Sequence, residues 1–532
     1  MKKNFKKMAA IFVAVATMVT MVGCGAKNES NNAAPTNGAT SEVTSTTGDA
    51  SADSGASTRD TISIAVDGDV GNMSVFGSGA TYSYVSNQIY EGLYAVGYDN
   101  EYVPRLAESW DKVDSTHYIF KIRQGVKFHD GNVLTANDVL FSFKLMQEDT
   151  NYSQYVTNVD FDKTKVVDDY TFELYFKEQN AYTFPNLSNI SIVSEASWNA
   201  SPDKMVTTPV GTGPYKLKDY VSGSNVTLEA FADYWGGAPD IKEATFTVIA
   251  EPSQKTTALE TGEVQLVMNL QTSDIEYLNK KSDYAVTKDI GVQSLSFFLN
   301  MHDNSVFANK QVRQALCYAL DNEAINTVSY GGYGLAGTAP FSSAMKDYND
   351  QMAGDIYTTS DMDKAKSLIK ESSVSGGTIK IVTDGTSPEI AAAEIIQNTL
   401  SELGFTAEIN NYDSATIWSV AADPTQWDLL LMVTASPSGY GVDSMKAFLG
   451  GLNWSGWTGE SFDNFMNLCT ETIGAGDEQT SNEKAIEVVK VIEEECPIYS
   501  AVQLVNCYAY DANLNFKVWN ASSLYLKDLK FK

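Results

Sequence analysis

Hydrophobic and polar residues alternate with a period of two along several stretches of the first half of the chain. Such alternation is typical of half-buried strands, because successive side chains of a strand point to opposite faces. It predicts strands over residues 61–69, 116–128, 225–235 and 241–249, and a hairpin over residues 165–176 that turns at Asp168 and Asp169.

In the second half, hydrophobic residues recur every three or four positions, which is typical of amphipathic helices. Helices are predicted over residues 309–325, 359–372, 388–403 and 482–495. Short apolar runs between them predict strands over residues 377–384 and 427–433. This alternation of strands and helices indicates an α/β class of fold.

The N-terminus carries four lysines within residues 1–7, followed by an uncharged and mostly apolar run over residues 8–22. The run has 15 residues, fewer than the ~20 that a membrane-spanning helix needs, and suits a signal peptide over residues 1–23. Small residues directly before Cys24 resemble the lipobox of bacterial lipoproteins. The resemblance implies cleavage before Cys24 and lipidation of its thiol; the alternative is an ordinary secreted protein with a chance cysteine.

Residues 25–60 are rich in Ser, Thr, Asn, Gly and Ala and contain no aromatic residue. A segment of this composition cannot bury a core, so residues 24–60 are predicted to be a lipidated cysteine and a disordered tether. Behaving as a flexible coil, the tether would separate its ends by about 30 Å. The folded part is expected to begin near Thr61.

The folded part is long enough for two or three domains with their own cores. The whole chain has 37 Lys and Arg against 67 Asp and Glu, for a net charge of −30. This charge argues against nucleic acid or an anionic membrane surface as a partner, so the lipid is expected to be the only membrane contact. Four further cysteines lack C-x-x-C spacing and leave a disulfide open: Cys317, Cys469, Cys496 and Cys507.

Candidate catalytic chemistry is sparse. The chain has only three histidines, well separated in sequence, which argues against a histidine metal cluster. His129 stands beside Asp130, as half of an acid–base pair would. However, Asp130-Gly131 is a turn dipeptide, and residues 135–138 have the spacing of a capping box, so a strand, a turn and a capped helix are favoured over a catalytic site. We expect no enzyme activity, no cofactor and no metal.

Five blocks of the chain, taken together, resemble the peptide/nickel-type extracellular solute-binding proteins known as family 5. The first contains "KIRQGVKFHDGNVLTANDVLFSF" and the second "PVGTGPYKLKDY". The blocks keep their order from about residue 61 to residue 532, and they cover residues 105–143, 209–220, 232–267, 298–325 and 453–466.

The resemblance implies an α/β, two-lobed periplasmic-binding-protein-like fold of the class II type, with three domains. Domain I would combine residues 61–91, 246–303 and 506–532. Domain II would cover residues 92–245 and domain III residues 304–505. Two crossovers near residues 304 and 505 would form a hinge that lets the lobes close over a ligand.

The resemblance also implies where a ligand would bind. Thr81 and Tyr82, in the loop after the first strand, are expected to line the cleft from domain I. Peptide-binding members place an acid in domain III to pair with the ligand's ammonium. In the best register Ser436 stands at that position, and either Asp443 replaces the acid or the ligand lacks a free N-terminal ammonium.

Aromatic residues of domain III are further candidates for the cleft. Tyr440 follows the same strand as Ser436, with an ordinary turn tyrosine as its alternative; the alternative for Asp443 is a helix N-cap. Trp454 and Trp457 would offer aromatic surface, with core packing as the alternative for both. Tyr330 and Tyr333 are weaker candidates.

These features together predict a lipid-anchored, monomeric receptor on the outer face of a cell membrane, as in Gram-positive bacteria. It would deliver peptides or peptide-like solutes to the permease subunits of an ABC importer. Alternatives are a receptor for a nickel chelate, an opine or an oligosaccharide on the same fold, a peptide sensor, or a surface hydrolase.

Overall fold

The structure is a computed structural model, and it describes residues 59–97, 101–413, 415–436, 438–518 and 524–532. The predicted signal peptide, the predicted tether and Cys24 lie outside these residues. The described residues fold as one compact unit.

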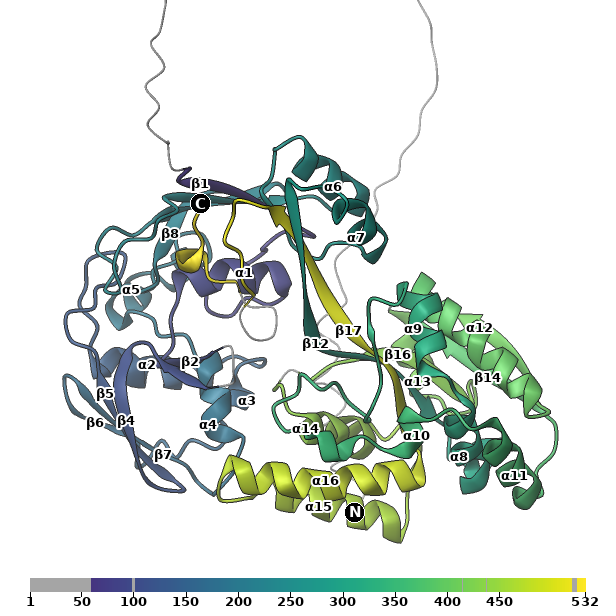
Figure 1. Cartoon of the computed structure of the whole chain (residues 1–532). Coiled ribbons are helices and arrows are strands. Elements are labelled where there is room, and N and C mark those ends of the chain that lie inside the picture. The colour runs from purple at the N-terminus through teal and green to yellow at the C-terminus, as the bar shows by residue number, and fades with distance from the viewer. Residues whose placement is uncertain (1–58, 98–100, 414, 437, 519–523) are drawn as a thin grey trace, which may run out of the picture. The chain divides into compact units, whose positions relative to one another are not determined.

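The strands agree with most of the predicted ones (Figure 1). They are β1 (Thr61–Val66), β2 (Tyr94–Val96), β3 (Tyr102–Pro104), β4 (Ala107–Asp114), β5 (His117–Ile122), β6 (Lys165–Asp168), β7 (Thr171–Tyr175), β8 (Tyr215–Val221), β9 (Asn225–Ala230), β10 (Glu243–Val248), β11 (Leu266–Val267), β12 (Tyr284–Leu299), β13 (Leu335–Ala336), β14 (Thr378–Thr383), β15 (Thr406–Asn411), β16 (Leu429–Thr434) and β17 (Ile498–Asp511).

Within the described residues these strands form three sheets. The largest has the order β15-β14-β16-β12-β17-β11-β1-β10-β9-β8, with β13 paired to β17. A second sheet has the order β4-β5-β7-β6, and β2 pairs with β3. The predicted hairpin over residues 165–176 is confirmed as β6 and β7, which pair antiparallel.

Helices flank the sheets, and among the described residues none is long and apolar enough to cross a bilayer. The α-helices are α1 (Ala80–Ile89), α2 (Ala136–Met146), α3 (Ser153–Val156), α4 (Thr183–Asn186), α5 (Glu195–Ala200), α6 (Pro252–Glu260), α7 (Thr272–Leu278), α8 (Lys310–Ala319), α9 (Asn322–Tyr330), α10 (Asp355–Thr358), α11 (Met362–Ser372), α12 (Ser387–Glu402), α13 (Thr416–Ala421), α14 (Gly441–Met445), α15 (Glu460–Ile473) and α16 (Glu478–Glu495). Short 3-10 helices span Leu187–Asn189, Pro202–Val206, Val306–Ala308, Asp350–Met352 and Leu526–Asp528, and a π-helix spans Lys446–Leu452.

One predicted helix is wrong in extent. Residues 309–325 were expected to be continuous, but the structure divides them into α8 and α9. Leu320 and Asp321 are extended, and the Asp321 side chain accepts a hydrogen bond from the N–H of Ala324. Aspartate is a strong N-cap, so Asp321 starts a second helix at a point where the hydrophobic spacing alone predicts one continuous helix.

The His129 segment is structural, as the turn and capping spacing predicted. Gly131 has a φ of +90°, and the Asp138 carboxylate accepts from the N–H of Thr135 at 2.9 Å. The His129 ring is partly buried: Nε2 lies 3.0 Å from the carbonyl of Gly213, and Nδ1 accepts from the N–H of Gly211. Burial lowers the pKa of His129 to about 4, so the ring is neutral and holds the chain in place.

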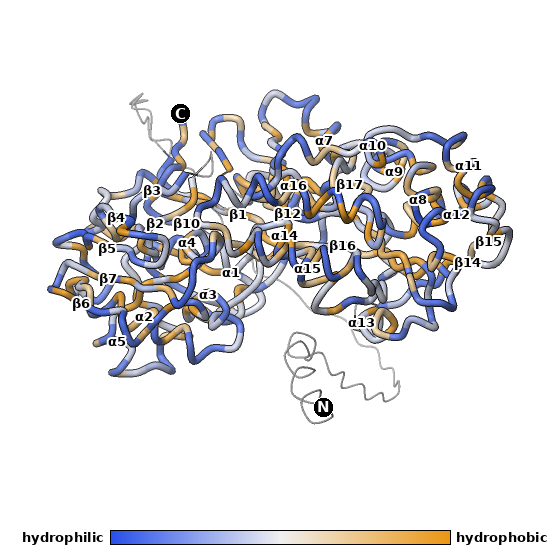
Figure 2. The backbone as a smooth tube through the Cα atoms, turned by 90° about the horizontal axis from the view of Figure 1, so that it is seen from below, coloured by the Kyte–Doolittle hydropathy of each residue, from blue (hydrophilic) through white to orange (hydrophobic). Residues whose placement is uncertain are grey.

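Two separate groups of core residues define two lobes, and hydrophobic stretches occur in both (Figure 2). The first lobe packs strands β1, β5 and β10 against α1 and α2. The second packs β14, β16 and α12 in one cluster and α13, α15 and α16 in another. The cysteines Cys317, Cys469, Cys496 and Cys507 are free thiols, buried within the structure.

The long strands β12 and β17 belong to both parts of the main sheet (Figure 1). They pair antiparallel from Tyr284 opposite Asp511 to Phe298 opposite Ile498. The register shifts between Ile290 and Ser294, a bulge that bends the pair where it passes from one part of the sheet to the other.

Candidate ligand-binding site

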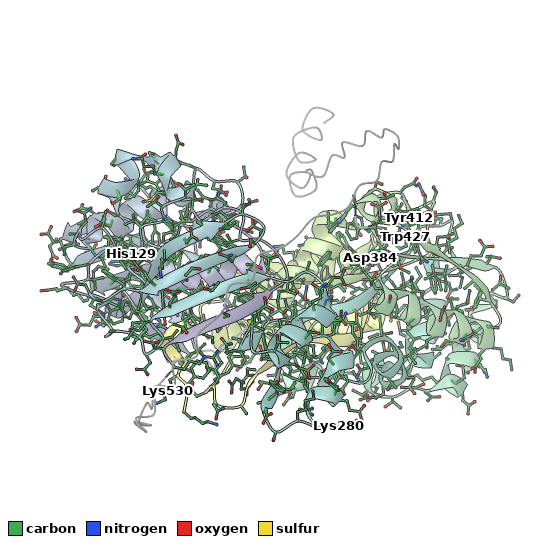
Figure 3. All side chains as sticks on the ribbon, turned by 90° about the horizontal axis from the view of Figure 1, so that it is seen from above. His129, Lys280, Asp384, Tyr412, Trp427 and Lys530 are labelled. Carbon is green, nitrogen blue, oxygen red and sulfur yellow. The ribbon has the colours of Figure 1, made fainter. Side chains whose placement is uncertain are left out.

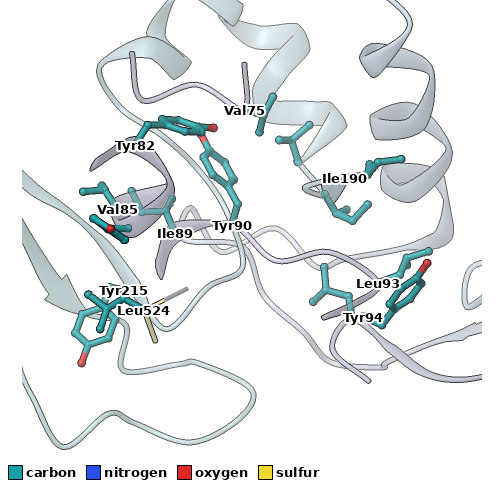
Figure 4. Packing of buried hydrophobic residues seen from close by; sticks show 14 of the residues in the cluster. Val75, Tyr82, Val85, Ile89, Tyr90, Leu93, Tyr94, Ile190, Tyr215 and Leu524 are labelled. Atoms are coloured by element: carbon teal, nitrogen blue, oxygen red, sulfur yellow. The ribbon is translucent and has the colours of Figure 1, made fainter. Parts of the chain in front are cut away.

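Thr81 and Tyr82 lie in the first turn of α1, and both are buried. The Tyr82 hydroxyl donates to the carbonyl of Ser74 at 2.8 Å, and its ring lies beside Tyr90 in the packed interior (Figure 4). Burial raises the pKa of Tyr82 far above its ordinary value, so the hydroxyl stays protonated.

Tyr82 also lines a cavity of about 240 Å³, which we call the tyrosine cavity. Near its wall, Glu91 accepts hydrogen bonds from Thr212, Tyr234 and Trp235 at 2.8 to 3.0 Å. Seven tyrosines line this cavity: Tyr82, Tyr90, Tyr94, Tyr152, Tyr155, Tyr234 and Tyr525.

A second cavity, of about 560 Å³, lies between segments of the two lobes; we call it the cross-lobe cavity. Ser438 and Asp443 line it from the second lobe. The first lobe lines it with Gln154, Tyr155, Thr157, Asn158, Lys177, Glu178, Asn180, Tyr182, Thr183 and Asn186. Its lining is rich in amide, hydroxyl and charged side chains, which can orient a polar solute. Asp443 is the third residue of α14, whose N-cap is Tyr440, so the N-cap alternative for Asp443 is wrong.

Tyr155 lines both the tyrosine cavity and the cross-lobe cavity. Tyr82 and Asp443, predicted from distant parts of the sequence, therefore lie in neighbouring cavities that share one wall. The structure brings these two predicted residues into the same region of the molecule.

Ser436 is 4% exposed and lies two residues after the end of β16. Its hydroxyl donates to the carbonyl of Tyr440 at 2.8 Å and lies 3.1 Å from the hydroxyl of Ser438. The side chain thus holds the turn that leads into α14. Its contact with a ligand stays a prediction.

Tyr440 is fully buried where the two lobes touch. Its ring stacks on Tyr182 of the first lobe, with 3.8 Å between centroids and 19° between planes. The Tyr182 hydroxyl donates to Asp347 of the second lobe at 3.1 Å. Asp347 also accepts from the backbone N–H groups of Gly441 and Val442 at 2.6 and 2.9 Å, so it caps the start of α14.

Other polar contacts cross the same boundary. Glu478 accepts from Tyr102 of the first lobe at 2.9 Å and from Tyr440 at 3.3 Å. The N–H of Ala181 donates to the carbonyl of Ile473 at 2.9 Å. We call this set, together with Tyr182 and Asp347, the cross-lobe contact.

Trp454 and Trp457 lie in the core of the second lobe, 7% and 1% exposed. Trp454 packs against Phe298, and the Trp457 indole N–H donates to Ser461 at 3.0 Å. The core-packing alternative describes both tryptophans in this structure. They lie outside the two cavities, as do the weaker candidates Tyr330 and Tyr333.

Sequence reasoning missed Tyr182, Asp347 and Glu478, which join the lobes. Asp347 lies in a polar turn and Glu478 opens a helix, so no periodic signal separates them from ordinary surface acids. Tyr182 and Asp347 are 165 positions apart in sequence, and only the fold brings them together.

The two lobes, their shared long strands and the cavity between them define the class of an extracellular solute-binding protein. Residues 101–456 match the model of the bacterial extracellular solute-binding proteins, family 5 (middle region). The chain belongs to this family.

Individual relatives agree. The dipeptide-binding protein of Escherichia coli K12 is 26% identical over 440 residues, covering 75% of this chain and 81% of that protein. The oligopeptide-binding protein AppA of Bacillus subtilis, solved with a nonapeptide, has a TM-score of 0.70 at 20% identity, over 89% of this chain and 99% of that one. NikA of Brucella suis, solved with Fe(III)-EDTA, has a TM-score of 0.77 at 19% identity, over 89% and 100%. The predicted two-lobed periplasmic-binding-protein-like fold is confirmed.

Proposed function

We propose that this chain is a lipid-anchored extracellular receptor that captures peptides or peptide-like solutes between its lobes and delivers them to an ABC importer. The observation that carries the proposal is the cross-lobe cavity, which draws polar residues from both lobes. Its volume of about 560 Å³ falls within the ~300–1,000 Å³ typical of ligand pockets. Family membership and the dipeptide-binding relative support the same solute class.

Charge in the cross-lobe cavity suits a dipolar solute. Asp443 of the second lobe lines the same cavity as Lys177 and Glu178 of the first. A peptide with free termini carries one charge of each sign, so each terminus would find an opposite partner. Thr81, Tyr82, Ser436 and Tyr440 would frame the neighbouring walls, with Trp454 and Trp457 as further candidates.

Closure would follow from contact with both lobes, because only a ligand that binds the closed form better shifts the equilibrium toward it. We place the hinge at two crossovers, one near residue 304, in the segment after β12, and one near residue 505, within β17. The predicted domains are kept: residues 61–91, 246–303 and 506–532 as domain I, residues 92–245 as domain II and residues 304–505 as domain III.

A metal-chelate receptor is the second candidate function. Ser436 stands where peptide binders are expected to place an acid, and the similar NikA structure contains Fe(III)-EDTA. An opine or oligosaccharide receptor, a peptide sensor and a surface hydrolase are less well supported.

Mass spectrometry of the solute that co-purifies with the protein tests the proposal directly. We expect peptides, and titration with a peptide mixture should change the intrinsic tryptophan fluorescence as the lobes close. Binding of nickel chelates or sugars with no response to any peptide would contradict the peptide assignment.

The anchor is tested separately. Cys24→Ser should abolish incorporation of labelled palmitate and release the protein from the membrane fraction, whereas Cys317→Ser, a buried thiol, should leave both unchanged. Retention of the Cys24→Ser protein in the membrane would contradict lipid anchoring. Size-exclusion chromatography with light scattering tests the monomer.

A further inference from the structure

The strands β15, β14 and β16 of the second lobe are parallel neighbours. The helix α12, which links β14 to β15, packs with Ile396 in the same core cluster as Ile381 of β14. The helix α13, which links β15 to β16, packs with Val420 in the other cluster, together with Val382 of β14. Successive residues of a strand point to opposite faces, so α12 and α13 cover opposite faces of the sheet.

The chain therefore changes face between β14 and β16. In open parallel sheets such a switch leaves a crevice outside the carboxyl ends of the strands, and ligands bind there. We call this place the β14–β16 crevice. It is defined by Thr383, the last residue of β14, and Asp384 directly after it, by Glu389 in the first turn of α12 and by Val433 near the end of β16.

The crevice holds a buried acid that lacks a full set of partners. Glu389 is 1% exposed, and its Oε1 atom has no hydrogen-bond partner among the described residues. Its Oε2 atom accepts a long bond, 3.2 Å, from the N–H of Asp384. Asp384 is partly exposed and lies on the second lobe (Figure 3).

The groups of the described residues that these interactions place near Glu389 include no cationic side chain. They are the carboxyl of Asp384, the backbone N–H of Val433 on β16 and the hydroxyl of Tyr330 on α9. Burial, and then the neighbouring carboxyl of Asp384, raises the pKa of Glu389 to about 9. Glu389 therefore keeps its proton at neutral pH, and its neighbour is a second carboxyl, that of Asp384.

We propose that Asp384 and Glu389 receive a cationic group, an ammonium or a guanidinium, of the solute held between the lobes. This inference rests on the proposed function. Among the described residues no group of three or more His, Cys, Asp and Glu side chains is placed to hold a metal ion. Two carboxyls can form charge-assisted hydrogen bonds with one ammonium.

Binding should release a proton. When the cation arrives, the Glu389 carboxylic acid gives its proton to solvent and becomes a carboxylate that accepts the cation's N–H groups. Calorimetric titration in two buffers of different ionisation enthalpy should report release of close to one proton per bound cationic peptide at pH 7. In Glu389→Gln this release should disappear.

The competition experiment uses three tripeptide mixtures: one with free N-termini, one N-acetylated without lysine, and one N-acetylated with a central lysine. We expect wild-type protein to bind at least one cationic mixture tenfold or more tightly than the acetylated mixture without lysine. Preference for the free N-termini assigns the crevice to the terminal ammonium, and preference for the acetylated lysine mixture assigns it to the side chain.

Variants then test which residues produce the preference for cationic peptides. Asp384→Asn, at a partly exposed position, should reduce it about tenfold, and Glu389→Gln should act likewise. Glu402→Gln, at the exposed far end of α12, should leave it unchanged. Thermal melts verify that each variant folds.

Two results separate the possible failures. If wild-type protein binds cationic peptides and Asp384→Asn keeps the full preference, or Asp443→Asn alone removes it, this inference is overturned and the proposed function stands. If wild-type protein retains none of the three mixtures, the proposed function falls and the inference falls with it.

Discussion

Two buried acids of the second lobe, Asp347 and Glu389, differ in what the fold supplies to them. Asp347 is fully buried and accepts three hydrogen bonds, from Tyr182 and from the N–H groups of Gly441 and Val442. Glu389 is as deeply buried but accepts one long bond, and its Oε1 atom has none among the described residues. Burial raises the pKa of both.

The difference separates a structural acid from one available to a ligand. An acid whose donors come from the protein is satisfied before any solute arrives, and it helps to hold the lobes together. An acid that lacks donors gains most from a partner that arrives from outside. The first belongs to the cross-lobe contact and the second to the β14–β16 crevice.

Removing Asp347 should have the largest effect. Asp347→Ala leaves the N–H groups of Gly441 and Val442 and the Tyr182 hydroxyl buried without this acceptor, at a cost of about 3 kcal/mol in the free energy of unfolding. Denaturant unfolding of the second lobe measures this. Asp350→Ala, at an exposed position of the same segment, should change the stability by no more than ~0.5 kcal/mol. Equal losses in the two variants would show that Asp347 is not the acceptor the structure indicates.

Tyr182→Phe should weaken closure while sparing most of the stability. The variant keeps the ring that stacks on Tyr440 and removes only the hydroxyl that crosses to Asp347, which retains two backbone donors. A hydrogen bond contributes about 0.5–1.5 kcal/mol net, so the ratio of open to closed forms should rise several-fold.

Energy transfer between dyes placed on the two lobes measures this ratio. Tyr277→Phe removes an exposed tyrosine hydroxyl that donates to Glu260, and it should leave the transfer unchanged. A Tyr182→Phe protein as closed as wild type would assign closure to the remaining contacts, such as Tyr102 with Glu478.

Glu389→Gln should change how stability depends on pH. The folded protein holds the Glu389 proton up to about pH 9, whereas the unfolded chain loses it near its ordinary pKa of 4.5. Stability from this group is therefore complete below pH 4.5 and falls as the pH rises toward 9, by at most about 1.4 kcal/mol per pH unit. Glutamine cannot ionise, so the variant should melt at a higher temperature than wild type at pH 8 and lose this slope.

Melting curves between pH 5 and pH 9 measure the effect, and subtraction of the wild-type curve cancels the other titrating groups. Glu402→Gln serves as the control, because this exposed residue ends the same helix. A wild-type slope preserved in Glu389→Gln would mean that Glu389 is ionised in the folded protein.

The sequence predicted the fold more fully than the site. Alternating and helical patterns predicted the elements that the strongest periodicity marks, among them β1, β5, β14, α12 and α16, but not the short strands and helices between them. The five resembling blocks predicted the two lobes. The helix break at Asp321 was missed because hydrophobic spacing outweighed a capping signal that one residue carries. Asp384 did leave a signal, an acid directly after a buried strand and before a helix, where ligands of parallel sheets bind.

The site residues proved harder because burial is a property of the assembled chain. Tyr182 and Asp347 meet across the two lobes, and nothing in either local sequence announces the partner. Trp454 and Trp457 have the composition of a ligand-binding surface, yet the helices around them place them in the core. Residue type alone does not separate these outcomes.

Ser436→Ala should have the smallest effect. The Ser436 hydroxyl already donates to the Tyr440 carbonyl, and the side chain is 4% exposed, so its loss should cost about 1 kcal/mol in stability and change peptide affinity by less than threefold. Calorimetry with the peptide mixture and a melting curve measure the two quantities. A tenfold loss of affinity at unchanged melting temperature would instead place Ser436 in direct contact with the solute. The acid expected at this position would then have been replaced by a hydroxyl that binds the same solute, and Glu389 would no longer be needed to explain recognition.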